Sequence, residues 1–277
     1  MRLGRVRYKG RTYLARASDR EIELVRTEDD RPTSDALRDA LATADLATLD
    51  VIESVDPDDC RVLAPLRSPG KFLAVGLNYV DHAAESATAP PTSPLLFSKA
   101  SSSIVGPDDD IIVPTDETAQ VDYEVELALV IARPCRKVSV AQAADNILGY
   151  TVCNDISARD AQFQDGQWHR GKSFDTFGPL GPWIVDGLGG APDLAITCML
   201  NGEVMQADRT SSMAFSPSEI VAYVSRFMTL LPGDVIATGT PPGVGFARSP
   251  AVYLNDGDTL VCEIEGIGQL RNAVVSR

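Results

Sequence analysis

The amino-acid sequence predicts an α+β fold in which strands predominate, with a small N-terminal α/β accessory unit before a larger second unit. Three observations support this prediction. Residues 121–132, VDYEVELALVIA, alternate with the period of two that is typical of a strand. The helical patterns elsewhere are few and short, and they lie between further strand patterns. Pro65, Pro69 and Gly70 indicate a boundary that divides the chain into residues 1–66 and 67–277.

The composition is typical of a folded, soluble protein and argues against several kinds of partner. Of the 277 residues, 44% are hydrophobic and 23% are charged, and the formal net charge is −14. Such acidity disfavours binding to nucleic acid or to anionic membranes, so any site for an anion must be built locally. No apolar run has the length of a membrane span, and the N-terminus lacks the apolar core of a secretory signal. Five scattered cysteines, interpreted as buried free thiols, indicate a cytoplasmic protein.

The N-terminal unit is expected to begin with short strands over residues 3–25. Ser34 is a candidate cap for a helix over residues 35–42, and a weaker helical pattern covers residues 46–52. No residue of this unit carries a chemistry that can be named. We therefore interpret residues 1–66 as a packing or dimerisation module.

The second unit is expected to consist of strands separated by short helices. Helices are expected over residues 78–86, after the cap Ser139, over residues 156–163 and after the cap Ser216. Asn201-Gly202 is a strong two-residue hairpin signal. In order along the chain, the expected strands cover residues 71–75, 95–98, 111–113, 121–132, 148–155, 182–185, 195–200, 203–206 and 231–238, and two more follow in the tail.

The strand over residues 121–132 carries two carboxylates on one face. Glu124 and Glu126 are two residues apart, which places their Cα atoms about 6.5–7 Å from each other at the usual strand rise. Like charges on one face repel each other unless a cation or water separates them. The residues therefore leave two interpretations open: a face in contact with solvent, or a face on which a positive group lies.

A third carboxylate, Asp155, follows the strand over residues 148–155. At the end of a strand and the start of a helix, an aspartate often serves only as an N-cap. Together with Glu124 and Glu126, however, it would supply three hard oxygen ligands from two strands. That ligand set, completed by water, suits Mg²⁺ or Mn²⁺, whereas nothing in the sequence favours zinc.

His82 and Glu85 lie three residues apart on the helix expected over residues 78–86, so their side chains share a face. A neighbouring carboxylate raises the pKa of a histidine and can hold one tautomer, which makes a usable general base. An exposed polar patch is the alternative interpretation. The following residues 86–93, SATAPPTS, are suited to a mobile loop, so the pair is expected to lie on a lid.

Two loops contain further candidates. Residues 166–173, GQWHRGKS, match the phosphate-loop pattern, but the required strand before it and helix after it are missing, so a nucleotide site is rejected. Lys172 then remains as a lone cation or an ordinary solvated lysine. Residues 239–245, GTPPGVG, could offer backbone amides and the Thr240 hydroxyl to a ligand carboxylate, although a plain rigid turn fits equally well.

Taken together, the motifs resemble the fumarylacetoacetate hydrolase family, particularly its acylpyruvate hydrolase and oxaloacetate decarboxylase branch. The resemblance covers about residues 68–275. Any single motif is modest support, but eight of them occur in order. They are GLNYVDHAAE (76–85), LLFSKASSSIVGP (95–107), VDYEVELALVIAR (121–133), GYTVCNDISARDAQ (149–162), GKSFDTFGPLGPW (171–183), NGEVMQ (201–206), TSSMAFS (210–216) and LLPGDVIATGTPPGVG (230–245).

This resemblance implies a mixed β-sheet roll or sandwich as the catalytic core over residues 67–277, in a homodimer. It implies that the metal ligands, to Mg²⁺ or Mn²⁺, are Glu124, Glu126 and Asp155. It also implies that His82 and Glu85 form a dyad that activates water. A cluster around a small 2-oxo acid is implied for Lys172, Arg159, Gln162 and Thr240.

The activity expected from the resemblance is metal-dependent hydrolysis of a carbon–carbon bond in a 2,4-dioxo acid of the acylpyruvate or fumarylpyruvate type. The metal would stabilise a pyruvate enolate, and His82 with Glu85 would activate the attacking water. Decarboxylation of oxaloacetate and isomerisation or hydration of an unsaturated 2-oxo diacid use the same enolate and remain alternatives. A protein that only binds 2-oxo acids is a further alternative of another class.

Overall fold

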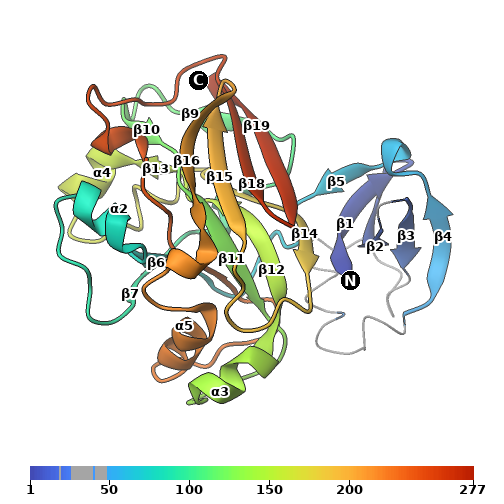
Figure 1. The fold of residues 1–277 in the computed structure, drawn as a ribbon. Helices are drawn as coiled ribbons and strands as arrows, with labels where there is room; N and C mark the ends of the chain where they lie inside the picture. The colour runs from blue at the N-terminus through green and yellow to red at the C-terminus, as the bar shows by residue number, and fades with distance from the viewer. Residues whose placement is uncertain (19, 26–39, 41–48) are drawn as a thin grey trace.

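The computed structural model describes residues 1–18, 20–25, 40 and 49–277, and strands predominate in it (Figure 1). The largest sheet has 12 strands. They are β1 (Arg2–Tyr8), β2 (Arg11–Ala17), β3 (Ile22–Val25), β4 (Val51–Val55), β5 (Arg61–Leu63), β6 (Phe72–Gly76), β7 (Leu95–Ser98), β8 (Ile104–Val105), β11 (Val125–Ile131), β12 (Ile147–Asn154), β14 (Gly178–Val185) and β17 (Val235–Ala237).

A five-stranded sheet packs against the middle of this large sheet, through contacts of β15 and β18 with β11 and β12. Its members are β16 (Glu203–Arg209), β15 (Ala195–Leu200), β18 (Thr259–Ile264), β19 (Gly268–Ser276) and β9 (Ile111–Val113), in that spatial order. A separate pair consists of β10 (Val121–Asp122) and β13 (Ser157–Ala158). This layered β architecture confirms the predicted fold class.

The central strand β11 is buried on both faces along its whole length. Its odd-numbered residues, such as Leu127 and Leu129, belong to the core cluster shared with β15, β18 and β19. The alternate residues Ala128 and Val130 pack instead with residues of β6, β14 and β17. Both clusters contain side chains without any exposed surface. The strand predicted over residues 121–132 is therefore confirmed as the centre of the fold.

That strand is shorter than predicted, because the chain changes its pairing partner near Tyr123. Val121 and Asp122 pair with β13, whereas Val125 opens the antiparallel pairing of β11 with β12. Glu124 lies between the two pairings, with its N–H donated to the side chain of Asn154 at 3.0 Å. Because of this break, Glu124 is not part of the regular β11–β12 pairing and lies beside the end of β12.

The short helices follow the predicted caps closely. Ser139 begins α3 (Val140–Ala143) and Ser216 begins α5 (Pro217–Val224), each with a complete capping box. The other described α-helices are α2 (Val80–Glu85) and α4 (Arg159–Gln164), and 3-10 turns cover Pro57–Asp59, Ser101–Ser103, Ala144–Asn146, Thr210–Ser212 and Gly245–Ala247. α2 is shorter than the helix predicted over residues 78–86, and α4 begins only at Arg159, because β13 precedes it.

The strands β1–β4 form a lobe at one side of the molecule, visible on the right of Figure 1. The lobe is joined to the rest because β1 pairs with β14, next to β12. Its independence as a domain of residues 1–66 stays a prediction. The helix expected over residues 35–42 lies, apart from Ala40, outside the described residues. The helical pattern over residues 46–52 is wrong at its end, since Val51 opens β4 through its pairing with Val25.

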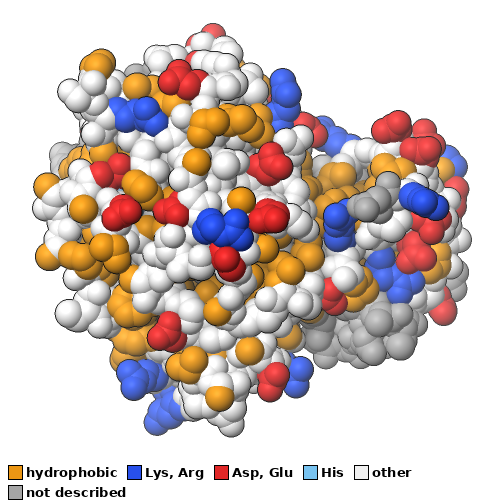
Figure 2. Space-filling model, in the orientation of Figure 1, with side chains coloured by type: hydrophobic (Ala, Val, Ile, Leu, Met, Phe, Trp, Pro, Cys, Tyr) orange, Lys and Arg blue, Asp and Glu red, His pale blue; other side chains and the backbone are white. Residues whose placement is uncertain are grey.

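The surface and the cysteines agree with the composition. On the face drawn in Figure 2, basic side chains of the described residues are scattered among acidic ones. No helix in the described part of the chain is long and apolar enough to cross a membrane. All five cysteines are free, and four of them are buried, which confirms most of that prediction; Cys60 is half-buried.

Asn78 ties the segment before α2 to two other parts of the fold. Its side-chain amide donates to the carbonyls of Thr238 at 2.7 Å and Phe215 at 3.0 Å, and its carbonyl accepts from the Phe215 N–H at 2.9 Å. The residue has no exposed surface. Three backbone groups would therefore lose their partner if this side chain were removed.

We expect Asn78→Ala to lower the free energy of unfolding by about 3 kcal/mol or more, because each buried backbone group left without a partner costs about 1–3 kcal/mol. Denaturant unfolding measures this. The matched control is Asn255→Ala, since Asn255 is exposed and its side chain donates to the Tyr253 carbonyl at 2.8 Å. The control should cost under about 1 kcal/mol. Equal losses for the two variants would contradict the role of Asn78.

Candidate metal centre and active site

Three buried carboxylates meet where β11 begins and β12 ends. Glu124, Glu126 and Asp155 each offer an oxygen, and these oxygens all lie within 4.8 Å of one another. The antiparallel register brings them together, because Val125 pairs with Asn154. The three side chains are 5%, 1% and 0% exposed. The interpretation of Glu124 and Glu126 as a solvated face is therefore wrong. Asp155 does not cap α4, whose N-cap position is Ala158.

Two lysines contact the carboxylates from inside the protein. Lys172 Nζ lies 2.7 Å from Glu124 Oε2 and 2.7 Å from Asp155 Oδ2. Lys99 Nζ lies 2.6 Å from the other oxygen, Asp155 Oδ1, and it also donates to the Lys172 carbonyl. Both lysines are almost fully buried. Lys172 is thus not the solvated lysine that the loop sequence left open.

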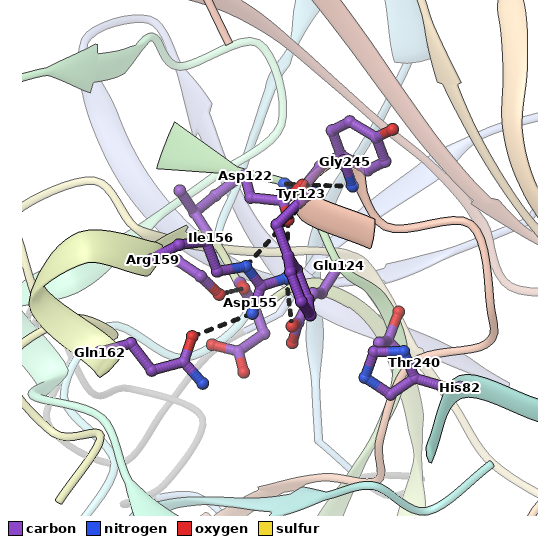
Figure 3. A network of polar contacts seen from close by, with 12 residues as sticks. His82, Asp122, Tyr123, Glu124, Asp155, Ile156, Arg159, Gln162, Thr240 and Gly245 are labelled. Carbon is purple, nitrogen blue, oxygen red and sulfur yellow. Dashed lines mark hydrogen bonds and ion pairs between the residues drawn. The ribbon is translucent and has the colours of Figure 1, made fainter. Parts of the chain in front are cut away.

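Arg159 supplies the third cation of this cluster (Figure 3). Its Nη2 lies 2.7 Å from Glu124 Oε1 and 2.8 Å from Asp122 Oδ2, and its Nη1 donates to Gln162 Oε1 at 2.9 Å. Asp122 in turn accepts from the backbone N–H groups of Gly245 at 2.8 Å and Phe246 at 3.0 Å. The guanidinium is therefore fixed by its partners on several sides.

The electrostatics differ between the two glutamates. Burial alone would raise the pKa of Glu124, but the positive charges of Lys172 and Arg159 outweigh it and hold that pKa well below its usual range. Burial, the charge of Asp155 and the charge of Glu124 instead raise the pKa of Glu126 well above its usual range. Among the described residues no cation contacts Glu126, whose Oε2 accepts only from the Gly239 N–H at 2.8 Å.

Lys172 stays positively charged in these surroundings. Burial opposes its charge, but Asp155 and Glu124 outweigh that effect and raise the pKa of the ammonium group. The side chain is thus a fixed cation and a hydrogen-bond donor. It is not in the state required of a general base.

His82 and Glu85 form the pair that the sequence predicts. His82 Nδ1 lies 2.7 Å from Glu85 Oε1, and Glu85 Oε2 accepts from the Gly243 N–H at 2.9 Å. His82 is only 5% exposed, so the interpretation as an exposed polar patch is wrong. The dyad is docked onto the loop over residues 239–245. Whether residues 86–93 move as a lid stays a prediction.

A pocket of about 300 Å³ joins the carboxylates to the dyad. Figure 3 shows His82 and Thr240 on one side of Glu124 and Gln162 on the other. The residues lining the pocket are Val75, Gly76, Leu77, His82, Ser86, Thr88, Leu95, Phe97, Glu124, Glu126, Arg159, Gln162, Phe163, Trp168, Lys172, Thr240 and Phe246. Seven of the nine predicted site residues thus line one pocket. The other two contact residues that line it, Glu85 through His82 and Asp155 through Lys172.

Thr240 faces the pocket with its hydroxyl already engaged. The hydroxyl donates to the Val125 carbonyl at 2.9 Å and accepts from Gln206 Nε2 at 2.8 Å. Gln162 is different, since among the described residues only its side-chain carbonyl oxygen has a hydrogen-bond partner, the Arg159 guanidinium. The Gln162 amide nitrogen is therefore the better candidate for a hydrogen bond to a ligand.

Sequence reasoning missed Lys99 and Asp122. Asp122 carried a detectable signal, because it alternates with Glu124 and Glu126 at i, i+2 and i+4 in VDYEVE. Lys99 directly follows β7, and only its contact with Asp155 shows its role. The rejection of a phosphate loop agrees with the structure, in which residues 166–173 form turns after α4 and no helix follows them.

The comparison with protein families settles the relationship. A family model described as fumarylacetoacetate (FAA) hydrolase C-terminal matches residues 71–275. The chain belongs to the fumarylacetoacetate hydrolase family. The match includes every predicted site residue, and members of this family are enzymes that generally use divalent metals.

Relatives of this chain have names that describe several reactions. Oxaloacetate tautomerase Fahd2a, mitochondrial, from Rattus norvegicus is 45% identical over 239 residues, which cover 85% of this chain and 76% of the relative. A fumarylacetoacetate hydrolase structure from Exiguobacterium antarcticum has a TM-score of 0.86 at 38% identity, with both chains covered completely. A 2-hydroxyhepta-2,4-diene-1,7-dioate isomerase structure from Mycobacterium marinum has a TM-score of 0.82 at 40% identity, covering 100% of this chain and 99% of that one.

The carboxylate site fits a divalent metal ion. Its donors are hard oxygens from three carboxylates, as Mg²⁺ and Mn²⁺ prefer. Glu126 is buried without a cation of its own among the described residues, so a bound cation would supply the charge that it lacks. Which metal binds stays a prediction.

We expect metal binding to release protons and to tighten as the pH rises. Glu126 has a raised pKa in the fold, so its carboxyl group in the metal-free protein holds a proton that a metal ion must displace. For the same reason, the metal-free protein loses folding stability as the pH rises through that pKa. Calorimetric titration of chelator-treated protein with Mn²⁺, in buffers of different protonation enthalpy, measures the proton release. Affinity should change by up to about tenfold per pH unit.

Glu126→Gln should weaken binding strongly and abolish this proton release. The matched control is Glu265→Gln, because Glu265 is exposed and distant in sequence from the site. Affinity that is independent of pH in the unaltered protein would contradict the assignment of Glu126.

Proposed function

We propose that this protein is a divalent-metal-dependent tautomerase that moves a proton between C3 and the 2-oxo oxygen of a small 2-oxo acid, with oxaloacetate as the first substrate to test. One observation carries the proposal: the carboxylate cluster and the His82–Glu85 pair line or adjoin the same buried pocket. A 45%-identical relative named an oxaloacetate tautomerase supports it.

Glu124, Glu126 and Asp155 would hold the metal. When bound, a divalent cation would polarise the 2-oxo group and acidify the neighbouring C–H. The site is buried, so solvent would screen these charges weakly. Lys172 and Arg159 keep Glu124 ionised and ready to act as a ligand.

His82 is the proposed proton carrier. Glu85 accepts a hydrogen bond from Nδ1, which leaves Nε2 as the ring nitrogen that takes the proton from C3. The same nitrogen then gives that proton to the enolate oxygen, which forms the enol. In the opposite direction, Nε2 takes the proton from the enol oxygen and returns it to C3. The Gly243 N–H holds the second oxygen of Glu85, so the imidazole has a fixed orientation.

The remaining candidates would position the substrate. The Gln162 amide nitrogen is available to an oxygen of the substrate, and Lys172 and Arg159 provide fixed positive charge in an otherwise acidic protein. Thr240 would shape the pocket through its methyl group, since its hydroxyl is engaged with Val125 and Gln206.

Hydrolysis of a carbon–carbon bond in a 2,4-dioxo acid is the second candidate function. It was the first expectation from the sequence, and the same dyad could activate water for it. Tautomerisation ranks above it because proton transfer alone is sufficient, and because the rat and M. marinum relatives have names that describe proton transfer. The name of the E. antarcticum relative favours hydrolysis. Decarboxylation of oxaloacetate is the third outcome to be measured.

The predicted homodimer and the predicted absence of nucleic-acid and membrane partners remain proposals. The predicted cytoplasmic location also remains a proposal. The rat relative, by contrast, is named as a mitochondrial protein.

The deciding experiment measures three products with one preparation. Chelator-treated protein, with and without added Mg²⁺ or Mn²⁺, is mixed with the enol form of oxaloacetate, and ultraviolet absorbance follows its conversion to the keto form. Pyruvate release is followed in parallel from oxaloacetate and from acetylpyruvate. Metal-dependent ketonisation without pyruvate supports the tautomerase. Pyruvate from acetylpyruvate, with no acceleration of ketonisation, would establish the hydrolase instead.

We expect His82→Gln to lower the metal-dependent rate by about 10²–10⁴-fold, the usual contribution of a positioned acid–base group. Metal affinity should change little, since His82 is outside the carboxylate cluster. Asp81→Asn, on the exposed side of the same helix, serves as the control and should keep full activity. An unchanged rate in His82→Gln would rule out this histidine as the proton carrier.

We expect Gly243→Ala to reduce kcat by about tenfold or more through misplacement of Glu85. Gly243 has a φ of +108°, and a Cβ there would lie 2.2 Å from the Met205 carbonyl oxygen, so the backbone must shift. Gly257→Ala is the matched control, with a φ of +84° but open space around its Cβ. Similar kinetics for both variants would contradict the role of the Gly243 N–H.

A further inference from the structure

The loop over residues 239–245 carries the backbone N–H that holds Glu85, but the sequence of the loop does not fix that N–H in place. Gly243 donates it to Glu85 Oε2 at 2.9 Å and has a φ of +108°. Glycine can adopt this conformation because it lacks a Cβ, and for the same reason it is not confined to it. The N–H therefore points at Glu85 only if other groups hold Gly243.

The two ends of this loop are anchored by separate contacts. At its start, Thr240 Oγ1 donates to the Val125 carbonyl at 2.9 Å. At its end, the Gly245 N–H donates to Asp122 Oδ1 at 2.8 Å. Gly243 lies between these two anchors, so its position depends on further contacts.

A bulge in β16 forms the surface against which Gly243 packs. Val204 and Gln206 pair with consecutive residues of β15, so Met205 between them is an extra residue in the register of the two strands. The Met205 carbonyl oxygen lies so close to the loop that a Cβ on Gly243 would come within 2.2 Å of it. The bulge therefore brings a backbone acceptor against the middle of the loop.

Arg248 connects this bulge to the loop. Its Nη2 donates to the Met205 carbonyl at 2.6 Å, and its Nε donates to the Gly243 carbonyl at 3.2 Å. Tyr123 Oη donates to the same Gly243 carbonyl at 3.3 Å. A planar guanidinium presents its donors in a fixed fork, so it can hold two carbonyls in one relative position, which a lysine ammonium does less well.

We propose that Arg248 is a positioning residue of the reaction: its guanidinium holds Gly243 against the β16 bulge, so that Glu85 keeps His82 oriented for proton transfer. The proposal rests on the proposed function in that His82 is the proton carrier. Arg248 does not line the pocket, so its removal takes away no group that touches the substrate. The start of the loop, which donates to Glu126, keeps its own anchors.

The kinetic test compares Arg248→Ala and Arg248→Lys with the matched control Arg136→Ala, with the enol form of oxaloacetate as substrate and Mg²⁺ present. Arg136 also donates to two backbone carbonyls, those of Ser225 and Arg226, each at 2.7 Å, and it does not line the pocket. In Arg248→Ala, kcat should fall by about tenfold or more. KM and the affinity for Mn²⁺ should stay close to those of the unaltered protein. Arg248→Lys should lie between the two, and Arg136→Ala should keep full activity.

Guanidinium ions separate positioning from general damage to the fold. Added at a concentration far below that needed for unfolding, guanidinium should raise kcat of Arg248→Ala, because the ion can bridge the two carbonyls that the side chain held. It should not raise kcat of Gly243→Ala, in which the backbone itself has shifted.

A proton NMR signal tests the proposal without any reaction. The Nδ1–H of His82, which is hydrogen-bonded to Glu85 at 2.7 Å, should give a downfield signal that exchanges slowly with water. The chain has two histidines, so absence of the signal in His82→Gln assigns it. In the Mg²⁺-loaded protein the signal should broaden or disappear in Arg248→Ala, return with guanidinium, and persist in Arg136→Ala.

An unchanged kcat and an unchanged NMR signal in Arg248→Ala would overturn the proposal. A loss of kcat that neither guanidinium nor the lysine variant restores in part would overturn it as well. Failure of the proposed function gives a different result. The unaltered protein would then show no catalysed ketonisation, while the NMR signal would still distinguish Arg248→Ala from Arg136→Ala.

Discussion

The burial of three carboxylates within 4.8 Å of one another is the constraint on which the site depends. Such a cluster is stable only if cations and hydrogen bonds compensate the repulsion and the loss of hydration. Lys99, Lys172 and Arg159 provide that compensation for Asp155 and Glu124, and they leave Glu126 without a cation of its own in the described structure. The unequal distribution of charge is what makes the cluster suited to one more positive ion.

The fold places the catalytic pair against this cluster through long-range contacts. β11 carries Glu126 and pairs with β17, whose continuation forms the loop that holds Glu85 through Gly243. Asn78 connects the start of the α2 segment to the end of β17. The metal cluster and the dyad are therefore supported by the same central strands and by the same loop, whose Gly239 N–H donates to Glu126 and whose Gly243 N–H donates to Glu85.

Much of this arrangement follows from the sequence, for physical reasons that differ between elements. The alternation in VDYEVELALVIA predicts β11 and the shared face of Glu124 and Glu126, because strand geometry is local. The capping boxes at Ser139 and Ser216 are local as well. Lys99 was not predicted as a partner of Asp155, because the contact joins residues 56 positions apart. The pairing of Val51 with β3 outweighed a weak helical pattern for the same reason.

Hydrolysis, decarboxylation and tautomerisation all use one enolate, so the residues alone do not decide between them, and the preference for tautomerisation rests on the names of relatives. The central claim is that the three carboxylates hold one divalent ion in the pocket. Anomalous X-ray scattering from crystals soaked in Mn²⁺ tests it most directly. A single strong peak surrounded by Glu124, Glu126 and Asp155 is the result that we predict. A protein that binds Mn²⁺ only elsewhere, such as at the acidic turn over residues 108–110, would contradict the account.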